Sequence, residues 1–127
     1  MKQKYLKCDK CGTLVEVFRD CTCDDCGIIC CGERMVELVP GTSDGAREKH
    51  VPVYVKEGNI INVTVGDIEH PMTSEHYIEW IELKTKYGKQ RKTLKPESDP
   101  KATFVLVEGD ELESVYAYCN LHGLWKA

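Results

Sequence analysis

The chain has 127 residues, among them eight cysteines and four histidines, and its formal net charge is −4. This length suits one ordinary domain. It also suits two domains, one of modest size and one so small that a metal or disulfides must stabilise it. The negative charge disfavours nucleic acid as a partner, which would select a clustered basic face, and no apolar run approaches the roughly 20 residues of a membrane span.

Short strands between cysteine pairs are predicted for the N-terminal part. Residues 13–18 are apolar and β-branched, and residues 35–39 alternate apolar with charged side chains. Turn-forming residues follow at 40–45. We place a domain boundary there, with domains at residues 1–40 and 41–127. The first domain is too short to bury much apolar surface, so a metal or disulfides are expected to stabilise it.

A series of short strands is predicted for the C-terminal part. In residues 60–65 the side chains alternate, so that Ile61, Val63 and Val65 share one face. The other predicted strands are residues 51–56, 77–87, 90–94, 102–107 and 112–118. About seven short strands without a helical period predict a mainly β protein. We expect a small metal-binding domain followed by an immunoglobulin-like β-sandwich.

Seven of the eight cysteines lie in the first 31 residues. A Cys-x-x-Cys-Gly knuckle such as that of Cys8 and Cys11 turns both thiolates toward one ion, and a second pair completes a tetrahedron for zinc or iron. Two second pairs are possible: Cys23 with Cys26, or the adjacent Cys30 with Cys31. The first seven residues lack the apolar run that export requires. We therefore expect a cytoplasmic protein, in which paired cysteines favour metal over disulfides.

Each histidine lies beside a proline, a glycine or a predicted strand end, where a β-sandwich gathers its loops. His70 and His76 are six residues apart with Pro71 between them, so they cannot share a helical face. The candidate ligands of a second metal are His50, His70, His76, Cys119 and His122. Five ligands exceed the four of structural zinc. They can form a square pyramid whose open position suits an iron that meets a small oxygen species.

These segments resemble the desulfoferrodoxin and neelaredoxin family of superoxide reductases over nearly the whole chain. The motifs that carry the resemblance are Glu48-Lys49-His50-Val51-Pro52, His70-Pro71-Met72 with Glu75-His76-Tyr77, and Cys119-Asn120-Leu121-His122-Gly123. At the N-terminus, the knuckle at Cys8 and the later Cys30-Cys31-Gly-Glu-x-Met are similar to a desulforedoxin-type domain. The resemblance implies superoxide reduction to hydrogen peroxide, with one electron and two protons taken up.

The resemblance also implies roles for individual residues. The four histidines would bind an iron equatorially and Cys119 axially, with Glu48 in the sixth position of the resting ferric state and Lys49 near the open face. A second iron would be held by Cys8, Cys11, Cys30 and Cys31, with an iron–sulfur cluster or zinc as alternatives. The implied partners are superoxide, an electron donor such as rubredoxin, and a second copy in a homodimer.

Lys49 also has a physical role, because a local cation offsets the repulsion between superoxide and a negatively charged protein. An extended segment would point Lys49 away from its neighbours Glu48 and His50. Glu48 and Lys49 can both serve the iron only if this segment is a bent or mobile loop. Trp80 and Trp125 are expected to pack in the core or line the site.

Three cysteines exceed the needs of these two sites: Cys21, Cys23 and Cys26. They lie in the 18-residue gap between Cys11 and Cys30 and are bystander thiols, alternative ligands or part of a larger cluster. Two other functions were weighed against superoxide reduction. A two-iron electron carrier without catalytic activity is weakened by the open position, and a zinc-stabilised binding module is weakened by the five-ligand set.

Overall fold

The computed structural model describes residues 4–24, 27–42 and 45–127, and the chain forms two compact units, residues 1–39 and 40–127. Each unit is described by itself. Among the described residues, no helix has the length and apolar content needed to cross a bilayer.

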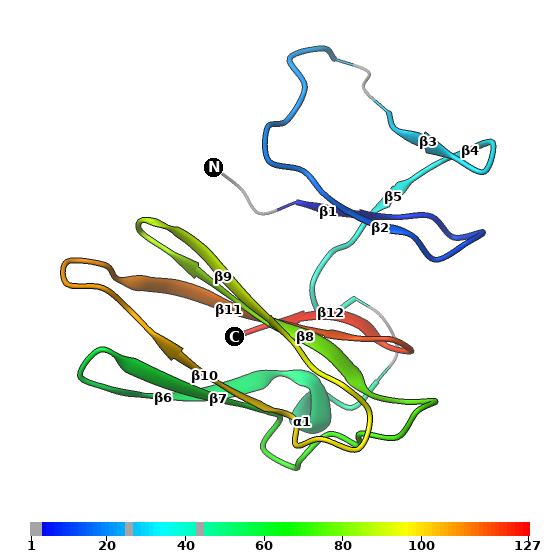
Figure 1. The fold of residues 1–127 in the computed structure, drawn as a ribbon. Coiled ribbons are helices and arrows are strands. Elements are labelled where there is room, and N and C mark those ends of the chain that lie inside the picture. Colours follow the sequence, from blue (N-terminus) through cyan, green and yellow to red (C-terminus); the bar gives the residue numbers. More distant parts are fainter. Residues whose placement is uncertain (1–3, 25–26, 43–44) are drawn as a thin grey trace. The chain divides into compact units, whose positions relative to one another are not determined.

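The described residues of the first unit form five short strands (Figure 1). They are β1 (Tyr5–Lys7), β2 (Leu14–Glu16), β3 (Ile29–Cys30), β4 (Glu33–Arg34) and β5 (Val36–Glu37). One antiparallel sheet has the order β2-β1-β5, and β3 pairs with β4 as a separate hairpin. Its buried apolar side chains among the described residues are Tyr5, Leu6 and Cys8. So small a core agrees with the expectation that this unit needs another source of stability.

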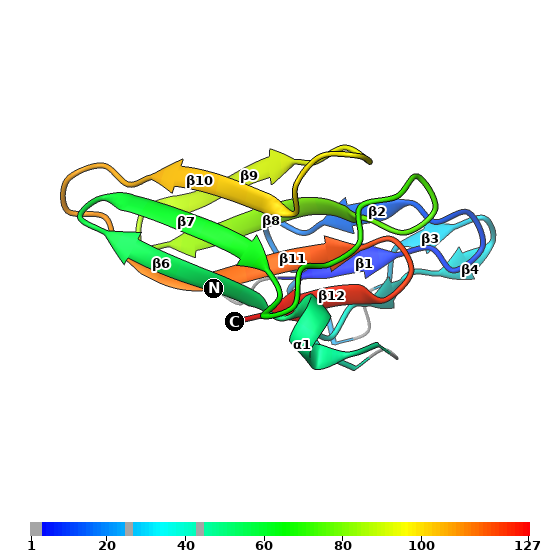
Figure 2. The ribbon, with the colours of Figure 1, turned by 90° about the horizontal axis from the view of Figure 1, so that it is seen from below.

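In the second unit, the part of the chain that the structure describes contains one short helix and seven strands. They are α1 (Arg47–His50), β6 (Pro52–Glu57), β7 (Ile60–Val65), β8 (Ile78–Thr85), β9 (Gly88–Thr93), β10 (Lys101–Val105), β11 (Leu112–Cys119) and β12 (Gly123–Lys126). Two antiparallel sheets, β10-β7-β6 and β12-β11-β8-β9, form the two layers seen in Figures 1 and 2. The predicted mainly β fold with a sandwich is confirmed.

The core lies between these two sheets. Ile61, Val63 and Val65 of β7 are buried, as their alternation predicted, and they meet residues of β8 and β11 from the facing sheet. On β11, alternate residues enter this core and end at Cys119. The strand period therefore buries the sulfur at one end of the sandwich.

Among the described residues of the second unit, two elements were not predicted. β12 was missed because its four residues begin with a glycine and show no alternation long enough to recognise. The helix α1 is a single turn, too short for a helical period, and it bends the segment that contains Lys49. Its C-terminal residue, His50, is 2% exposed.

Candidate metal centres

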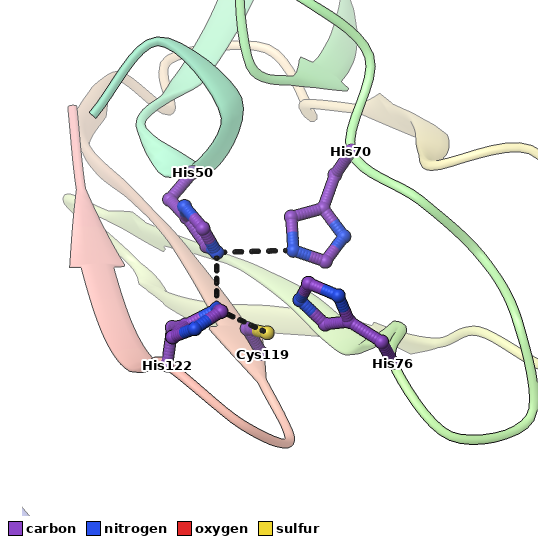
Figure 3. A group of neighbouring side chains, drawn as sticks. All are labelled: His50, His70, His76, Cys119 and His122. Carbon is purple, nitrogen blue, oxygen red and sulfur yellow. Dashed lines mark hydrogen bonds between the residues drawn. The ribbon is translucent and has the colours of Figure 1, made fainter. Parts of the chain in front are cut away.

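Five potential metal ligands meet at the end of the sandwich that bears α1 (Figure 3). They are His50 at the end of α1, His70 and His76 in the β7–β8 connection, Cys119 at the end of β11, and His122 before β12. One potential ligand atom from each lies within 4.8 Å of all the others. His70 is 2% exposed and Cys119 is fully buried. The structure thus brings together all five residues predicted for this site.

The hydrogen bonds of two imidazoles determine which nitrogen faces the centre. Nδ1 of His50 lies 2.7 Å from the carbonyl oxygen of Ala46, and Nδ1 of His70 lies 2.7 Å from that of Pro71. A carbonyl oxygen only accepts hydrogen bonds, so Nδ1 carries the proton in both rings. Nε2 of each neutral ring is therefore a bare acceptor directed inward, as is typical of metal-binding histidines.

These inward nitrogens approach one another closely. Nε2 of His50 lies 3.1 Å from Nε2 of His70 and 3.0 Å from Nδ1 of His122. With both Nδ1 positions protonated, the contact between His50 and His70 brings two lone pairs together. Such a contact is favourable only when a proton or a metal ion lies between the nitrogens.

The remaining donors complete the set. Nε2 of His76 is buried and finds no hydrogen-bond partner in the described part of the chain. Sγ of Cys119 lies 3.9 Å from Nδ1 of His122. Four imidazole nitrogens and one sulfur suit a transition metal of borderline softness. The residues present therefore fit an iron ion.

Burial sets the protonation of this group. It lowers the pKa of His70 to about 4, although the hydrogen bond to Pro71 opposes this effect. The pKa of His76 is lowered by burial and by the charges of His122, His50 and Lys49. Burial also raises the pKa of Cys119, against hydrogen bonds from the backbone N–H groups of His122 and Leu121. Burial therefore favours the neutral forms of His70 and His76, and neutral imidazole is the form that binds metal.

Asn120 joins the two loops that carry ligands. Its Oδ1 accepts a hydrogen bond from the backbone N–H of Tyr77 at 3.0 Å, and its Nδ2 donates to the carbonyl of Glu75 at 3.0 Å. Its backbone N–H also donates to the carbonyl of Tyr77. These contacts tie the segment around His76 to the turn between Cys119 and His122. The sequence contained no signal for this role beyond the position of Asn120 beside a ligand.

Lys49 is an exposed residue of α1. Its charge is among the causes that lower the pKa of His76, so it acts electrostatically on the histidine cluster. The backbone of Glu48 belongs to the same helical turn, and its side chain lies outside the described part of the structure.

Four cysteines form a second group in the first unit: Cys8, Cys11, Cys30 and Cys31. Gly12 follows the first pair at a φ of +81°. The β3–β4 hairpin turns at Cys31 and Gly32, both with positive φ, as a two-residue type I′ turn requires. The two tight turns bring Sγ of Cys11 within 3.6 Å of Sγ of Cys30, which lies 3.9 Å from Sγ of Cys31.

The thiols of this group differ in acidity. A hydrogen bond with the Thr13 hydroxyl, 3.0 Å from the sulfur, lowers the pKa of Cys11 to about 6. The pKa of Cys30 is raised to about 12, chiefly through hydrogen bonds with Cys8 and then Cys11. The pKa of Cys31 is also raised, first by a hydrogen bond with Cys11. Because the pKa values of Cys30 and Cys31 are raised, these thiols need a nearby cation to become thiolates. Four cysteine sulfurs suit iron or zinc as that cation.

The extra cysteines divide into different states. Cys21 is disulfide-bonded, whereas Cys23 is an exposed thiol. Cys26 lies outside the described residues. Cys21 lines a cavity of about 310 Å³ in the first unit, with Lys4, Arg19 and Arg34 among its neighbours. None of the four clustered cysteines borders this cavity, so it is separate from the sulfur site.

Comparison with known proteins shows the family to which the chain belongs. The sequence profile of the family described as desulfoferrodoxin matches residues 42–127. The desulfoferrodoxin of Nitratidesulfovibrio vulgaris is 48% identical over 121 residues, covering 95% of this chain and 92% of the relative. The chain belongs to the desulfoferrodoxin family. The predicted family resemblance is confirmed.

Solved structures resemble the chain at two levels of coverage. The superoxide reductase of Treponema pallidum matches with a TM-score of 0.81 and 35% identity over 100% of this chain and 99% of the other. A superoxide reductase of Giardia intestinalis has a TM-score of 0.55 and 34% identity, covering 63% of this chain and 95% of its own. The match to the Treponema pallidum protein therefore covers the residues of both units.

Proposed function

We propose that this chain is a superoxide reductase that converts superoxide to hydrogen peroxide at a mononuclear iron. The proposed ligands are His50, His70, His76, Cys119 and His122. The observation that carries this proposal is the close approach of imidazole nitrogens, two of them 3.1 Å apart, beside a buried thiol. Proteins with which the chain shares its architecture include the superoxide reductase of Treponema pallidum.

The residues around this site have distinct tasks. Iron, when bound, supplies one electron, which superoxide takes up with two protons before it leaves as hydrogen peroxide. Lys49 attracts the superoxide anion and orients a water that delivers a proton. Ala46 and Pro71 accept the outer N–H groups of His50 and His70, which keeps both ring orientations fixed. The buried sulfur of Cys119 donates electron density, and the N–H groups of Leu121 and His122 temper that donation.

The role of Glu48 rests on family membership. We propose that its carboxylate would be a further ligand of a bound iron in its resting ferric state. Its place in α1, two residues before His50, is compatible with an approach to the centre.

The first unit is proposed as a desulforedoxin-type domain spanning residues 1–40, with the catalytic domain at residues 41–127. The ligands of its iron are Cys8, Cys11, Cys30 and Cys31. Zinc or an iron–sulfur cluster is the alternative occupant. We further propose a cytoplasmic homodimer that receives electrons from rubredoxin or a similar donor.

The function is tested by purifying the protein under native iron supply, then measuring iron, zinc and the visible spectrum in both oxidation states. The ferrous protein is next exposed to a known quantity of superoxide. We expect rapid oxidation, with one hydrogen peroxide formed for each superoxide consumed. A colourless zinc protein would contradict both iron sites. A coloured protein whose ferrous form superoxide does not oxidise would instead be an electron carrier.

A further inference from the structure

Trp125 of β12 contacts two of the five candidate ligands. Its indole ring lies nearly parallel to the imidazole of His50, with the ring centroids 4.9 Å apart and the planes inclined by 26°. Its Nε1–H donates a hydrogen bond of 3.0 Å to the backbone carbonyl of His122. A single side chain therefore links the helical turn that carries His50 to the turn that carries His122.

The sheet determines where this side chain points. Trp125 lies opposite Ala117 in the β11–β12 ladder, and directly opposed residues share one face of a sheet. Ala117 and Cys119 both face the core. Trp125 consequently enters the same end of the sandwich as Cys119, where it is 1% exposed.

The stacking of Trp125 on His50 differs from the contacts that His50 makes with His70 and His122. The imidazoles contact one another edge to face, at interplanar angles of 74° to 85° in the contacts between His50 and either His70 or His122. The indole instead covers a face of His50 and leaves its ring edge, with both nitrogens, available. Nδ1 can then bond Ala46 while Nε2 points to the centre.

We propose that Trp125 is a positioning residue for the histidine–cysteine centre, one that orients His50 and His122 and favours the more highly charged state of a bound metal. This inference rests on the proposed function. The face of an indole ring is electron-rich. An imidazole bound to a cation is electron-poor, and more so when the iron is ferric. In a buried site this attraction is weakly screened, so Trp125 lowers the reduction potential.

The test compares Trp125→Leu and Trp125→Phe with the wild type. Leucine removes both the aromatic face and the N–H donor, whereas phenylalanine keeps a weaker face without the donor. The matched control is Trp80→Phe, because Trp80 stacks on Tyr118, at 5.6 Å between centroids, and on none of the five ligands. The measurements are the midpoint potential of the histidine–cysteine iron, and the rate at which a chelator removes the metal from the loaded protein.

We expect Trp125→Leu to raise the potential and to release metal about tenfold faster, the size typical of changes to groups that orient ligands. Trp125→Phe should change both quantities in the same direction by less, and Trp80→Phe should change neither. A folded Trp125→Phe protein with the potential and release rate of the wild type would overturn the proposal, even if Trp125→Leu fails to fold. Both measurements are independent of superoxide turnover, so they distinguish failure of this inference from failure of the proposed function.

Discussion

At the scale of single residues, proton positions distinguish the histidine cluster from ordinary buried histidines. The outer N–H groups of His50 and His70 donate to backbone carbonyls, as expected of buried histidines. The inner nitrogens are what is unusual. They face each other at 3.1 Å. This arrangement disfavours the hypothesis in which the histidines are incidental to a zinc-stabilised binding module.

Lys49 is the residue whose role can be separated from metal binding. Lys49→Ala should slow the reaction of the ferrous protein with superoxide by about tenfold, because electrostatic steering of an anion is lost. The iron content and visible spectrum should stay as in the wild type. Stopped-flow or pulse-radiolysis rates at several ionic strengths measure the effect.

Lys49→Arg serves as the matched control for charge. It should retain most of the rate and its dependence on salt, since the cation remains. A Lys49→Ala protein that reacts at the wild-type rate would remove Lys49 from the mechanism.

The sulfur ligands can be assigned by single substitutions. Cys30→Ser or Cys31→Ser should abolish the absorption of the N-terminal iron, because each removes one of the four clustered sulfurs. Cys23→Ser is the matched control and should leave that absorption unchanged, as Cys23 is an exposed thiol outside the cluster. If the Cys23→Ser protein loses the absorption and the Cys30→Ser protein keeps it, Cys23 rather than Cys30 is a ligand of the N-terminal iron.

At the scale of elements, the candidate iron site is assembled from connections rather than from strand interiors. The β8 and β11 ladder shifts register between Tyr118 and Cys119, so Cys119 pairs with Ile78. Such irregularities redirect side chains at the ends of sheets. The loop before β8 and the turn after β11 thereby lie side by side, and Asn120 bonds them together.

Asn120→Ala should loosen the segment that carries His76. Two side-chain hydrogen bonds are lost, so the free energy of unfolding of the second unit should fall by about 2 kcal/mol. Metal release to a chelator should be about tenfold faster. Thermal or denaturant unfolding and chelator kinetics measure the two effects.

Asn120→Asp provides the comparison, because an aspartate keeps the acceptor for the N–H of Tyr77 and loses only the donor to Glu75. Its stability and release rate should lie between those of Asn120→Ala and the wild type. Equal release rates in all three proteins would show that this contact does not hold the His76 loop.

At the scale of the whole molecule, the two units depend on metal to different degrees. The second unit has a continuous core between two sheets, whereas the described part of the first buries only three apolar side chains. A domain of about 40 residues seldom folds without a staple. The metal of the first unit is therefore expected to supply its folding free energy.

Replacing both Cys8 and Cys11 by serine should unfold the first unit alone. Backbone amides of β1 and β2 should then exchange rapidly with solvent, while those of β7 and β8 stay protected. Hydrogen exchange measured by mass spectrometry or NMR gives both results. Protection that persists in β1 without metal would show that the small core suffices.

The oxidation of the histidine-centre iron by superoxide should be unaffected in the same protein. A superoxide reductase of Giardia intestinalis that matches only 63% of this chain agrees with independence of the second unit. Loss of that reaction together with the first unit would instead make the N-terminal metal part of catalysis.

The sequence by itself determined the mainly β class, most strands and the identity of the residues that gather. Alternation in β7 predicted which side chains are buried, since a strand has a period of two. Residue type and spacing predicted the five-ligand cluster and the pair Cys8 and Cys11, because few other side chains bind soft or borderline metals. The family resemblance, not the spacing, favoured Cys30 and Cys31 as the second pair. The short helix α1 and the strand β12 were missed, as each is too short for a recognisable period.

Tertiary structure decided how the clustered residues act. The choice between two second cysteine pairs depended on two turns, and in the structure Cys30 and Cys31 join Cys8 and Cys11. The proton positions of His50 and His70 depended on backbone carbonyls, and the orientation of His50 depended on Trp125. The contacts of Cys11 with Cys30 and of His50 with Trp125 join segments far apart in the chain, so no local pattern encodes them. The carbonyls of Ala46 and Pro71 are near their histidines in sequence, but their hydrogen bonds depend on ring orientations that form only when the chain folds.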